Sequence, residues 1–394
     1  MTLKALIQFV EKKLQPQFEK GGKFAKFHRS FEAFQTFLYV KGDVTLRGSH
    51  IRDAIDMKRT MFTVVIALLP ALLFGMWNVG LQHYNAIGLE VSFLQQFWFG
   101  MIQVTPLIIV SYVSGLAVEF IFAEIRNHEV NEGFLVSGML IPLIIPVTTP
   151  LWMVAVATIF AVIIGKEVFG GTGMNIWNPA LIARAFLFFA YPAQLSGEVW
   201  VETTLREGQQ LVDGFSGATP LALLAINEGQ YMPSLFEMFI GTIPGSIGET
   251  STLAILLGAV ILVVSGVGSF KIMASVVVGG LLMGGIFNLV GANEYMQLPA
   301  YYHLVLGGFM FGAVFMATDP VTASQTSFGK YIYGLLIGVV TVLIRVVNPA
   351  YPEGMMLAIL LMNMFASLID HYVVEANIKK RLKRLKAISV QTKA

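Results

Sequence analysis

The chain of 394 residues contains no cysteine. Without thiolates it can form no disulfide and cannot by itself hold an iron–sulfur cluster through cysteine. If the chain transfers electrons, organic cofactors must therefore carry them. Its six histidines show no metal-ligand spacing such as His-x-x-x-His, so we predict no metal site.

Charge is also scarce, because only 13% of the residues are charged whereas 56% are hydrophobic. The mean hydropathy of +0.71 lies far outside the range of soluble proteins. This composition predicts an integral membrane protein, embedded in the lipid bilayer. A removable signal peptide is not expected, since the first long apolar stretch begins only near residue 60.

Ten apolar stretches are long enough, or nearly long enough, to cross about 30 Å of hydrocarbon. We therefore predict an all-α integral membrane protein with about ten transmembrane helices. The fifth stretch, Pro179 to Tyr191, is short for a full span and also suits a half-helix. The stretches begin near Met61, Met101, Phe134, Leu151, Pro179, Thr252, Ile272, His303, Tyr331 and Met355.

Basic residues are concentrated in the two tails, which hold 19 of the 26 lysines and arginines. Cytoplasmic segments of membrane proteins carry such an excess, so both termini should be cytoplasmic. An even number of spans agrees with this topology. Residues 195–250 should then be external, and this segment has one basic residue, Arg206, against seven acids.

These patterns divide the chain into five parts. Residues 1–57 are polar with interleaved phenylalanines and lysines, which predicts either an amphipathic helix on the inner leaflet or a docking surface for a partner protein of the same complex. Residues 58–194 and 251–374 form two apolar halves, separated by the external loop 195–250. Residues 375–394 form a basic cytoplasmic tail, which we expect to contact anionic lipid headgroups and not nucleic acid.

The two halves share a short pattern. Pro146-Val147-Thr148 precedes Asn178-Pro179-Ala180 by 32 residues, and Pro320-Val321-Thr322 precedes Asn348-Pro349-Ala350 by 28 residues. Each pair of motifs brackets one apolar stretch, which predicts two five-helix repeats in inverted orientation. A passive channel or solute transporter would suit the same architecture, so this alternative stays open.

A polar loop of small residues interrupts the apolar chain and reads Asp213-Gly214-Phe215-Ser216-Gly217-Ala218-Thr219-Pro220. Pro220 fits the first position of a helix, where its missing N–H costs nothing, so Thr219 should be the N-cap. A phosphoryl group on Thr219 would meet the free amides and the positive end of that helix. The alternative is that Ala-Thr-Pro simply starts a helix.

A second dense cluster runs from Gly165 to Pro179 and contains Asn175, Trp177 and Asn178. It is not a phosphate-binding P-loop, because no Gly-Lys-Ser/Thr closes it. The two carboxamides, three residues apart beside Trp177, can offer donors and acceptors to a neutral ring such as a flavin. The alternative is a helix that ends in a glycine turn.

Three acids lie within apolar stretches or at their ends: Glu119, Asp319 and Asp370. Ionisable groups inside a membrane are costly and indicate an ion or proton pathway. Asp319 and Asp370 should lie near the cytoplasmic ends of their stretches, so simple solvation is an alternative for both. Arg345 and Glu353 should lie near the opposite face, where we expect them to form a structural pair.

The octet at 213–220 resembles the sequence Asp-Gly-x-Ser-Gly-Ala-Thr, at which a flavin transferase links FMN to threonine through its phosphate. Nearly the whole chain resembles the B subunits of sodium-translocating NADH:quinone oxidoreductases. A sister family, the D subunits of Rnf complexes, shares this motif and the membrane core but usually lacks so long an N-terminal segment. The other stretches that carry the resemblance are residues 49–53, 128–134, 166–173, 243–249 and 345–354.

The resemblance implies a flavin-carrying membrane subunit in a bacterial inner membrane. With its partner subunits it would transfer electrons from NADH to ubiquinone while sodium ions are driven outward. The resemblance further implies covalent FMN on Thr219 and a non-covalent riboflavin near Asn175 and Asn178. An Rnf-type ferredoxin:NAD oxidoreductase remains an alternative.

Other functional positions of the family match residues of this chain one by one. Its quinone site matches Gly115 and Glu119, although Leu116 stands where the family can carry a second glycine. Its acids linked to sodium uptake match Asp319 and Asp370, and we expect Glu119 to belong to the ion pathway as well. The expected cofactor-binding residues beside Thr219 are Asp213, Ser216, Gly217 and Ala218 for FMN, and Asn175, Trp177 and Asn178 for riboflavin.

Overall fold

The computed structural model describes residues 57–126, 133–204, 210–226, 232–348, 351 and 353–391. Before residue 57 it describes only short stretches, at 13–18, 21–24, 27–28, 30–32, 35, 45 and 47–51. Parts of the stretches named above therefore lie outside the described residues, namely 52–53, 128–132, 349–350 and 352, and so does Arg206.

The described residues form helices and contain no strand. Six helices are long and apolar enough to cross a membrane, so the chain is a multi-pass membrane protein. The third of them continues into a 3-10 turn, η3 (Glu167–Phe169). The six are α4 (Met57–Ala86), α5 (Phe93–Arg126), α7 (Leu151–Gly165), α12 (Phe270–Val290), α16 (Ser327–Val347) and α17 (Met355–Gln391).

Three other predicted stretches form short helices: α6 (Phe134–Leu143), α8 (Pro179–Ala190) and α11 (Thr252–Val264). At 1.5 Å per residue, the longest of them covers about 20 Å, which is less than the hydrocarbon core. The stretch predicted from His303 is broken into short pieces. Each predicted stretch therefore contains helix, but ten spanning helices in two inverted repeats are not confirmed and stay a prediction.

The broken stretch consists of α14 (Tyr302–Val305), α15 (Phe309–Phe311) and the π-helical segment η6 (Gly312–Met316). Gly307 has a φ of +55°, a conformation that favours glycine and ends the helical path. The break leaves backbone carbonyls without helical partners, which is costly inside a membrane. Arg345 of α16 is buried here and donates to the carbonyls of His303 and Leu306, at 2.7 and 2.8 Å.

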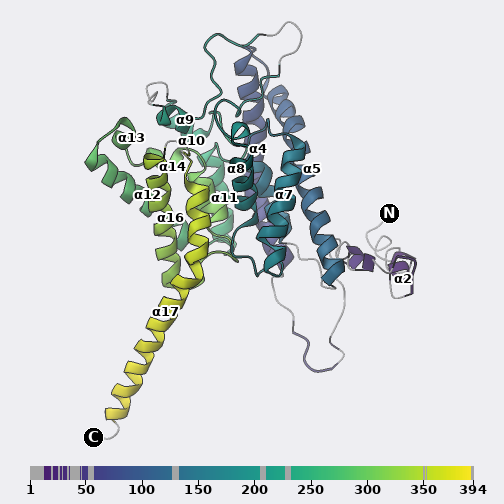
Figure 1. The fold of residues 1–394 in the computed structure, drawn as a ribbon, viewed down its shortest axis with the longest axis vertical. Helices are drawn as coiled ribbons and strands as arrows, with labels where there is room; N and C mark the ends of the chain where they lie inside the picture. The colour runs from purple at the N-terminus through teal and green to yellow at the C-terminus, as the bar shows by residue number, and fades with distance from the viewer. Residues whose placement is uncertain are drawn as a thin grey trace.

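The helices pack into a bundle in which α12 lies along α16 and α4 lies along α5 (Figure 1). Glycines allow α12 and α16 to approach closely. A Cβ atom at Gly279 would lie 2.2 Å from the carbonyl oxygen of Leu335, and one at Gly338 would lie 2.1 Å from that of Val276. Small residues at such contacts are typical of helix packing in membranes.

The two ends of the bundle differ (Figure 1). The short helices α9 (Pro220–Ala225), α10 (Leu235–Ile240) and α13 (Glu294–Gln297) lie at the upper end, whereas α17 projects beyond the lower end. The short helix α2 (Gln15–Phe18) also lies toward the lower end, where Ser30 donates to Glu124 of α5 at 2.9 Å. The short helices α9 and α10, which belong to the 195–250 segment, therefore lie at the end of the bundle opposite to α2 and to the projecting part of α17.

Candidate functional site

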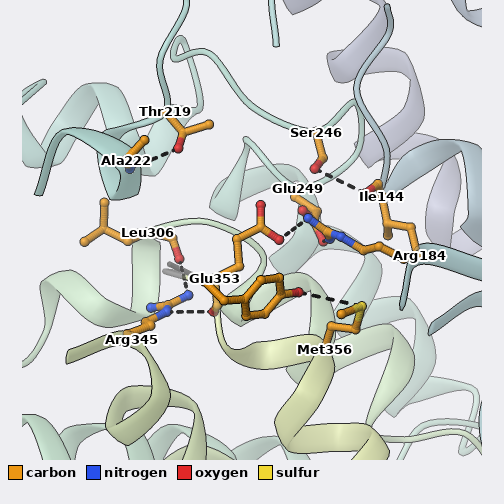
Figure 2. Close-up of polar contacts among 11 residues, drawn as sticks. Ile144, Arg184, Thr219, Ala222, Ser246, Glu249, Leu306, Arg345, Glu353 and Met356 are labelled. Carbon is orange, nitrogen blue, oxygen red and sulfur yellow. Dashed lines mark hydrogen bonds and ion pairs between the residues drawn. The ribbon is translucent and has the colours of Figure 1, made fainter. Parts of the chain in front are cut away.

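Thr219 lies at the upper end of the bundle, directly before α9. Its backbone is extended, with φ −74° and ψ 154°, and its Oγ1 accepts a hydrogen bond from the N–H of Ala222 at 3.2 Å (Figure 2). Pro220 occupies the first helical position. The prediction that Thr219 caps a helix is therefore confirmed.

The Thr219 side chain lines a cavity of about 370 Å³. This volume falls in the usual range of ligand pockets, about 300–1,000 Å³. Phe188, Trp200 and Tyr351 line it as well, and the rings of Phe188 and Tyr351 meet edge to face with centroids 4.4 Å apart. Burial raises the pKa of the Tyr351 phenol above its ordinary value, so this side chain stays neutral. The cavity thus offers apolar aromatic walls to a planar ring.

The motif residues before the threonine shape one side of the cavity. Ser216 Oγ donates to Glu198 Oε1 at 2.9 Å and accepts from the N–H of Ala218 at 3.2 Å. A Cβ atom at Gly217 would lie 2.6 Å from the carbonyl oxygen of Glu198, so only glycine fits there. Ser216 and Ala218 line the cavity, whereas Asp213 is exposed and does not.

Two charged residues of a larger network, Arg184 and Glu353, line the same cavity, and Figure 2 shows the polar contacts of this network. Arg184 of α8 donates to Glu249 Oε1 at 2.7 Å and also pairs with the carboxylate of Glu353. Arg345 donates to the backbone carbonyl of Glu353 at 3.0 Å. The predicted pairing of Arg345 with Glu353 therefore occurs through a backbone carbonyl, because the Glu353 carboxylate binds Arg184.

Arg184 is a candidate functional residue that no sequence motif marks, and Glu249 lies in the 243–249 stretch, for which no role was predicted. One signal for Arg184 is present in the sequence, since it is a charge inside an apolar stretch, and such charges in membranes indicate a function. Its partners lie 65 and 169 residues further along the chain. Sequence spacing therefore gives no means of pairing them.

A smaller cavity, of about 70 Å³, lies at the N-terminal end of α8. Asn175, Asn178, Lys166 and Asp319 line it, so the fold joins the 165–179 cluster to one of the predicted ion-pathway acids. Residues of turns, among them prolines and glycines, line this cavity together with four helices. The twelve-residue helix α8 thus contributes to the walls of both cavities, with its start at the smaller one and its middle at the larger one.

The three residues predicted to contact riboflavin do not all meet at this smaller cavity. Asn178 Oδ1 accepts from the N–H of Ala180 at 2.9 Å and so caps α8, and Asn175 donates to the carbonyl of Trp177 at 3.0 Å. The Trp177 side chain instead lines an open apolar groove with residues of α7 and α8. The structure therefore places Asn175 and Asn178 together and Trp177 on another surface.

The residues predicted for the quinone site lie on α5. Glu119 is buried and pairs with the ammonium group of Lys166, whose side chain is buried too. Gly115 lies one helical turn before Glu119, and a Cβ atom there would lie 1.8 Å from the ring of Phe134. Gly115 therefore admits that ring, and Glu119 is linked through Lys166 to the smaller cavity.

Two acids, Asp319 and Asp370, are expected to take part in sodium uptake. Both form hydrogen bonds with the turn of residues 319–326, which connects η6 to α16. Asp319 begins this turn and accepts hydrogen bonds from the N–H of Val321 at 3.1 Å and the hydroxyl of Thr322 at 2.9 Å. Asp319 also lines the smaller cavity. Its carboxylate therefore orders the backbone where that cavity ends.

Asp370 reaches the same turn from α17. Its carboxylate accepts from the N–H groups of Gln325 and Thr326 at 2.7 and 2.9 Å. It also accepts from the hydroxyls of Ser324 and Thr326, at 2.7 and 2.5 Å. Four hydrogen bonds favour the ionised carboxylate and fix the start of α16, so Asp370 has a structural role whether or not it also attracts cations.

Comparison with known proteins identifies relatives of this chain. A family model described as the NQR2, RnfD, RnfE family matches residues 44–379. Two proteins named as the B subunit of Na(+)-translocating NADH-quinone reductase, from Stutzerimonas stutzeri (strain A1501) and Chromohalobacter salexigens, are 48% and 49% identical to this chain. They cover 94% and 96% of it, over 98% and 97% of their own lengths.

A protein of the same name from Klebsiella pneumoniae (strain 342) is 47% identical over 98% of this chain and 100% of its own length. Similarity therefore extends along nearly the full chain, including the helices that line both cavities. The chain belongs to the NQR2, RnfD, RnfE family.

Proposed function

We propose that this chain is the B subunit of a sodium-translocating NADH:quinone reductase and that it carries FMN covalently on Thr219. The observation that carries this proposal is the position of Thr219 in the wall of a cavity of about 370 Å³ that Phe188, Trp200 and Tyr351 also line. The names of the relatives favour this complex over an Rnf complex and over a passive channel.

The residues around the larger cavity fit FMN. A phosphoester requires a hydroxyl, which Thr219 supplies, and a three-ring system requires a pocket of a few hundred cubic ångströms with apolar walls. FMN bound there would supply the redox chemistry that a chain without cysteine lacks. Its attachment requires a flavin transferase, and the electrons that reach this site would come from partner subunits of the complex.

We assign a second, non-covalent flavin, riboflavin, to the neighbourhood of Asn175 and Asn178. The cavity there, at about 70 Å³, lies below the usual pocket range and does not accommodate a flavin ring as it stands. Binding would require side chains to move. The amide N–H group of Asn178 is the one available to a ligand, because its oxygen caps α8.

Replacing both Asn175 and Asn178 with leucine is expected to remove riboflavin and leave covalent FMN in place, since the lost hydrogen bonds serve one site only. Acid extraction of the purified chain and chromatography of the released flavin measure this loss. Asn178→Asp is the matched variant, because aspartate caps a helix as well as asparagine but cannot donate. Riboflavin retained at full stoichiometry in the double variant would contradict the assignment.

We propose that quinone binds near Gly115 and Glu119 and that Asp319 and Asp370, with Glu119, attract sodium ions. The support is the family resemblance together with the burial of Glu119 and the convergence of Asp319 and Asp370 on one turn. We place the complex in the bacterial inner membrane with both termini cytoplasmic, because the basic residues concentrate in the tails.

Asp319→Ala and Asp370→Ala are each expected to raise the sodium concentration for half-maximal quinone reduction about tenfold, since removing an attractive charge weakens cation capture. A sodium titration of NADH-driven quinone reduction by the purified complex measures this, with flavin content unchanged. Asp370→Asn removes the charge and keeps an acceptor oxygen for three of the four hydrogen bonds that hold the turn.

Glu375→Gln is the control for the sodium titration, because Glu375 is a partly exposed acid on the same helix, paired with Lys379 at 3.1 Å. It should leave the titration unaltered. If both alanine variants also titrate like the unchanged complex, these acids serve the turn alone and the sodium proposal fails.

A further inference from the structure

Among the described residues that line the larger cavity, Arg184 is the one cation, and Glu198 and Glu353 are the acids. The guanidinium of Arg184 is held between Glu249 and Glu353, as Figure 2 shows. Arg345 is not a second cation of this wall, because its donors go to the carbonyls of His303, Leu306 and Glu353.

Keeping a charge at this position is costly. Arg184 is only 5% exposed, and burying an ion pair brings little net stability compared with apolar side chains of similar volume. The contact between α12 and α16, by comparison, is made through glycines and needs no such charge. A buried cation that lines a ligand-sized cavity in a membrane protein therefore indicates a function beyond packing.

We propose that Arg184 is the electrostatic partner of the flavin ring in this cavity, with Glu249 and Glu353 holding its guanidinium in place; the proposal rests on the FMN assignment to Thr219. When the ring takes up two electrons from the partner subunits and one proton from water, it gains one negative charge. A fixed guanidinium in the wall stabilises that charge, and the two acids limit how strongly it does so.

This arrangement makes two substitutions act in opposite directions. Arg184→Met removes the cation and leaves two acids, so the reduction potential of the covalent flavin should fall. Glu353→Gln removes one acid and keeps the cation, so the potential should rise. Each change should alter the equilibrium between oxidised and reduced flavin by about tenfold or more, as expected for a unit charge at close range.

The measurement is a spectroelectrochemical titration of the full-length chain, produced together with its flavin transferase. Fluorescence of the denatured band reports covalent flavin separately, so the two proposals fail independently. Because Arg184→Met leaves two acids without a cation, Arg184→Met combined with Glu249→Gln provides a variant in which one acid remains and the net charge of the unchanged trio is restored. Its potential should lie between those of Arg184→Met and the unchanged chain.

Glu167→Gln is the matched control, because it breaks another ion pair of a buried acid, with Arg126 at the C-terminal end of α5, and lines neither cavity. It should leave the potential of the covalent flavin unchanged. Potential shifts of opposite sign in Arg184→Met and Glu353→Gln support the proposal. Covalent flavin with an unmoved potential in Glu353→Gln, or shifts of the same sign in both, would overturn it.

Discussion

Thr219→Val is expected to yield a folded chain with no covalent flavin at all. Valine keeps the shape of threonine but lacks the oxygen that a phosphoester requires. The hydroxyl also caps α9 through the N–H of Ala222, and losing such a cap costs about 1 kcal/mol, too little to unfold a bundle of this size. Flavin fluorescence of the denatured band and mass spectrometry of the peptide from Asp213 to Leu224 measure the result.

The control for this substitution is Ser234→Ala in the same loop. Ser234 caps α10, which is six residues long like α9, so the variant loses an equivalent cap without losing the modified hydroxyl. It should keep its covalent flavin in full. Fluorescence that persists in Thr219→Val would remove the main support for the proposed function and put the channel alternative first.

The largest expected loss of stability follows Lys166→Met. This change removes the ammonium group that pairs with the buried carboxylate of Glu119. Breaking a buried ion pair from one side costs about 3–5 kcal/mol, because an uncompensated charge stays in the interior. We expect a marked fall in the thermal unfolding temperature of the purified chain in detergent.

Removing both charges should reverse most of that loss. In Lys166→Met combined with Glu119→Leu neither charge of this pair remains, and apolar replacements of a buried pair are often neutral or stabilising. The double variant should therefore unfold near the temperature of the unchanged chain, although we expect its quinone reduction to stay impaired. A double variant less stable than Lys166→Met alone would show that the pair stabilises the bundle beyond charge compensation.

Composition and hydropathy predict the membrane class and the positions of the helices, because both depend on local residue content. They do not predict where a helix stops inside the bundle. The stretch from His303 is as apolar as a spanning helix, yet it breaks at Gly307, where the distant Arg345 binds the freed carbonyls. Such breaks are surrounded by protein and not by lipid, so the residues at the break can be as apolar as those of a spanning helix. The hydropathy pattern therefore does not reveal the interruption.

Candidate-site residues were predictable where their chemistry is local. The Ala-Thr-Pro sequence fixes the N-cap at Thr219, and an asparagine before a proline fixes the cap of α8 at Asn178. The Arg184 network depends on α8, the 243–251 loop and the turn before α17 meeting in space. A single sequence does not show that these three segments come together. Nor does it show that Asp370 accepts hydrogen bonds from the turn at 324–326.

The position of α8 between the two cavities limits how this family can change length. Each inserted or deleted residue turns the rest of a helix by about 100° and shifts it by about 1.5 Å. A single insertion after Pro179 would therefore carry Arg184 and Phe188 out of the larger cavity while leaving Asn178 and Pro179 at the smaller one. The alignment with the Klebsiella pneumoniae protein runs over 424 positions, more than the 394 residues of this chain, so relatives do carry extra residues. We expect those residues to lie in the loops and tails, because a change in the length of the twelve-residue α8 would shift the wall of one cavity relative to the other.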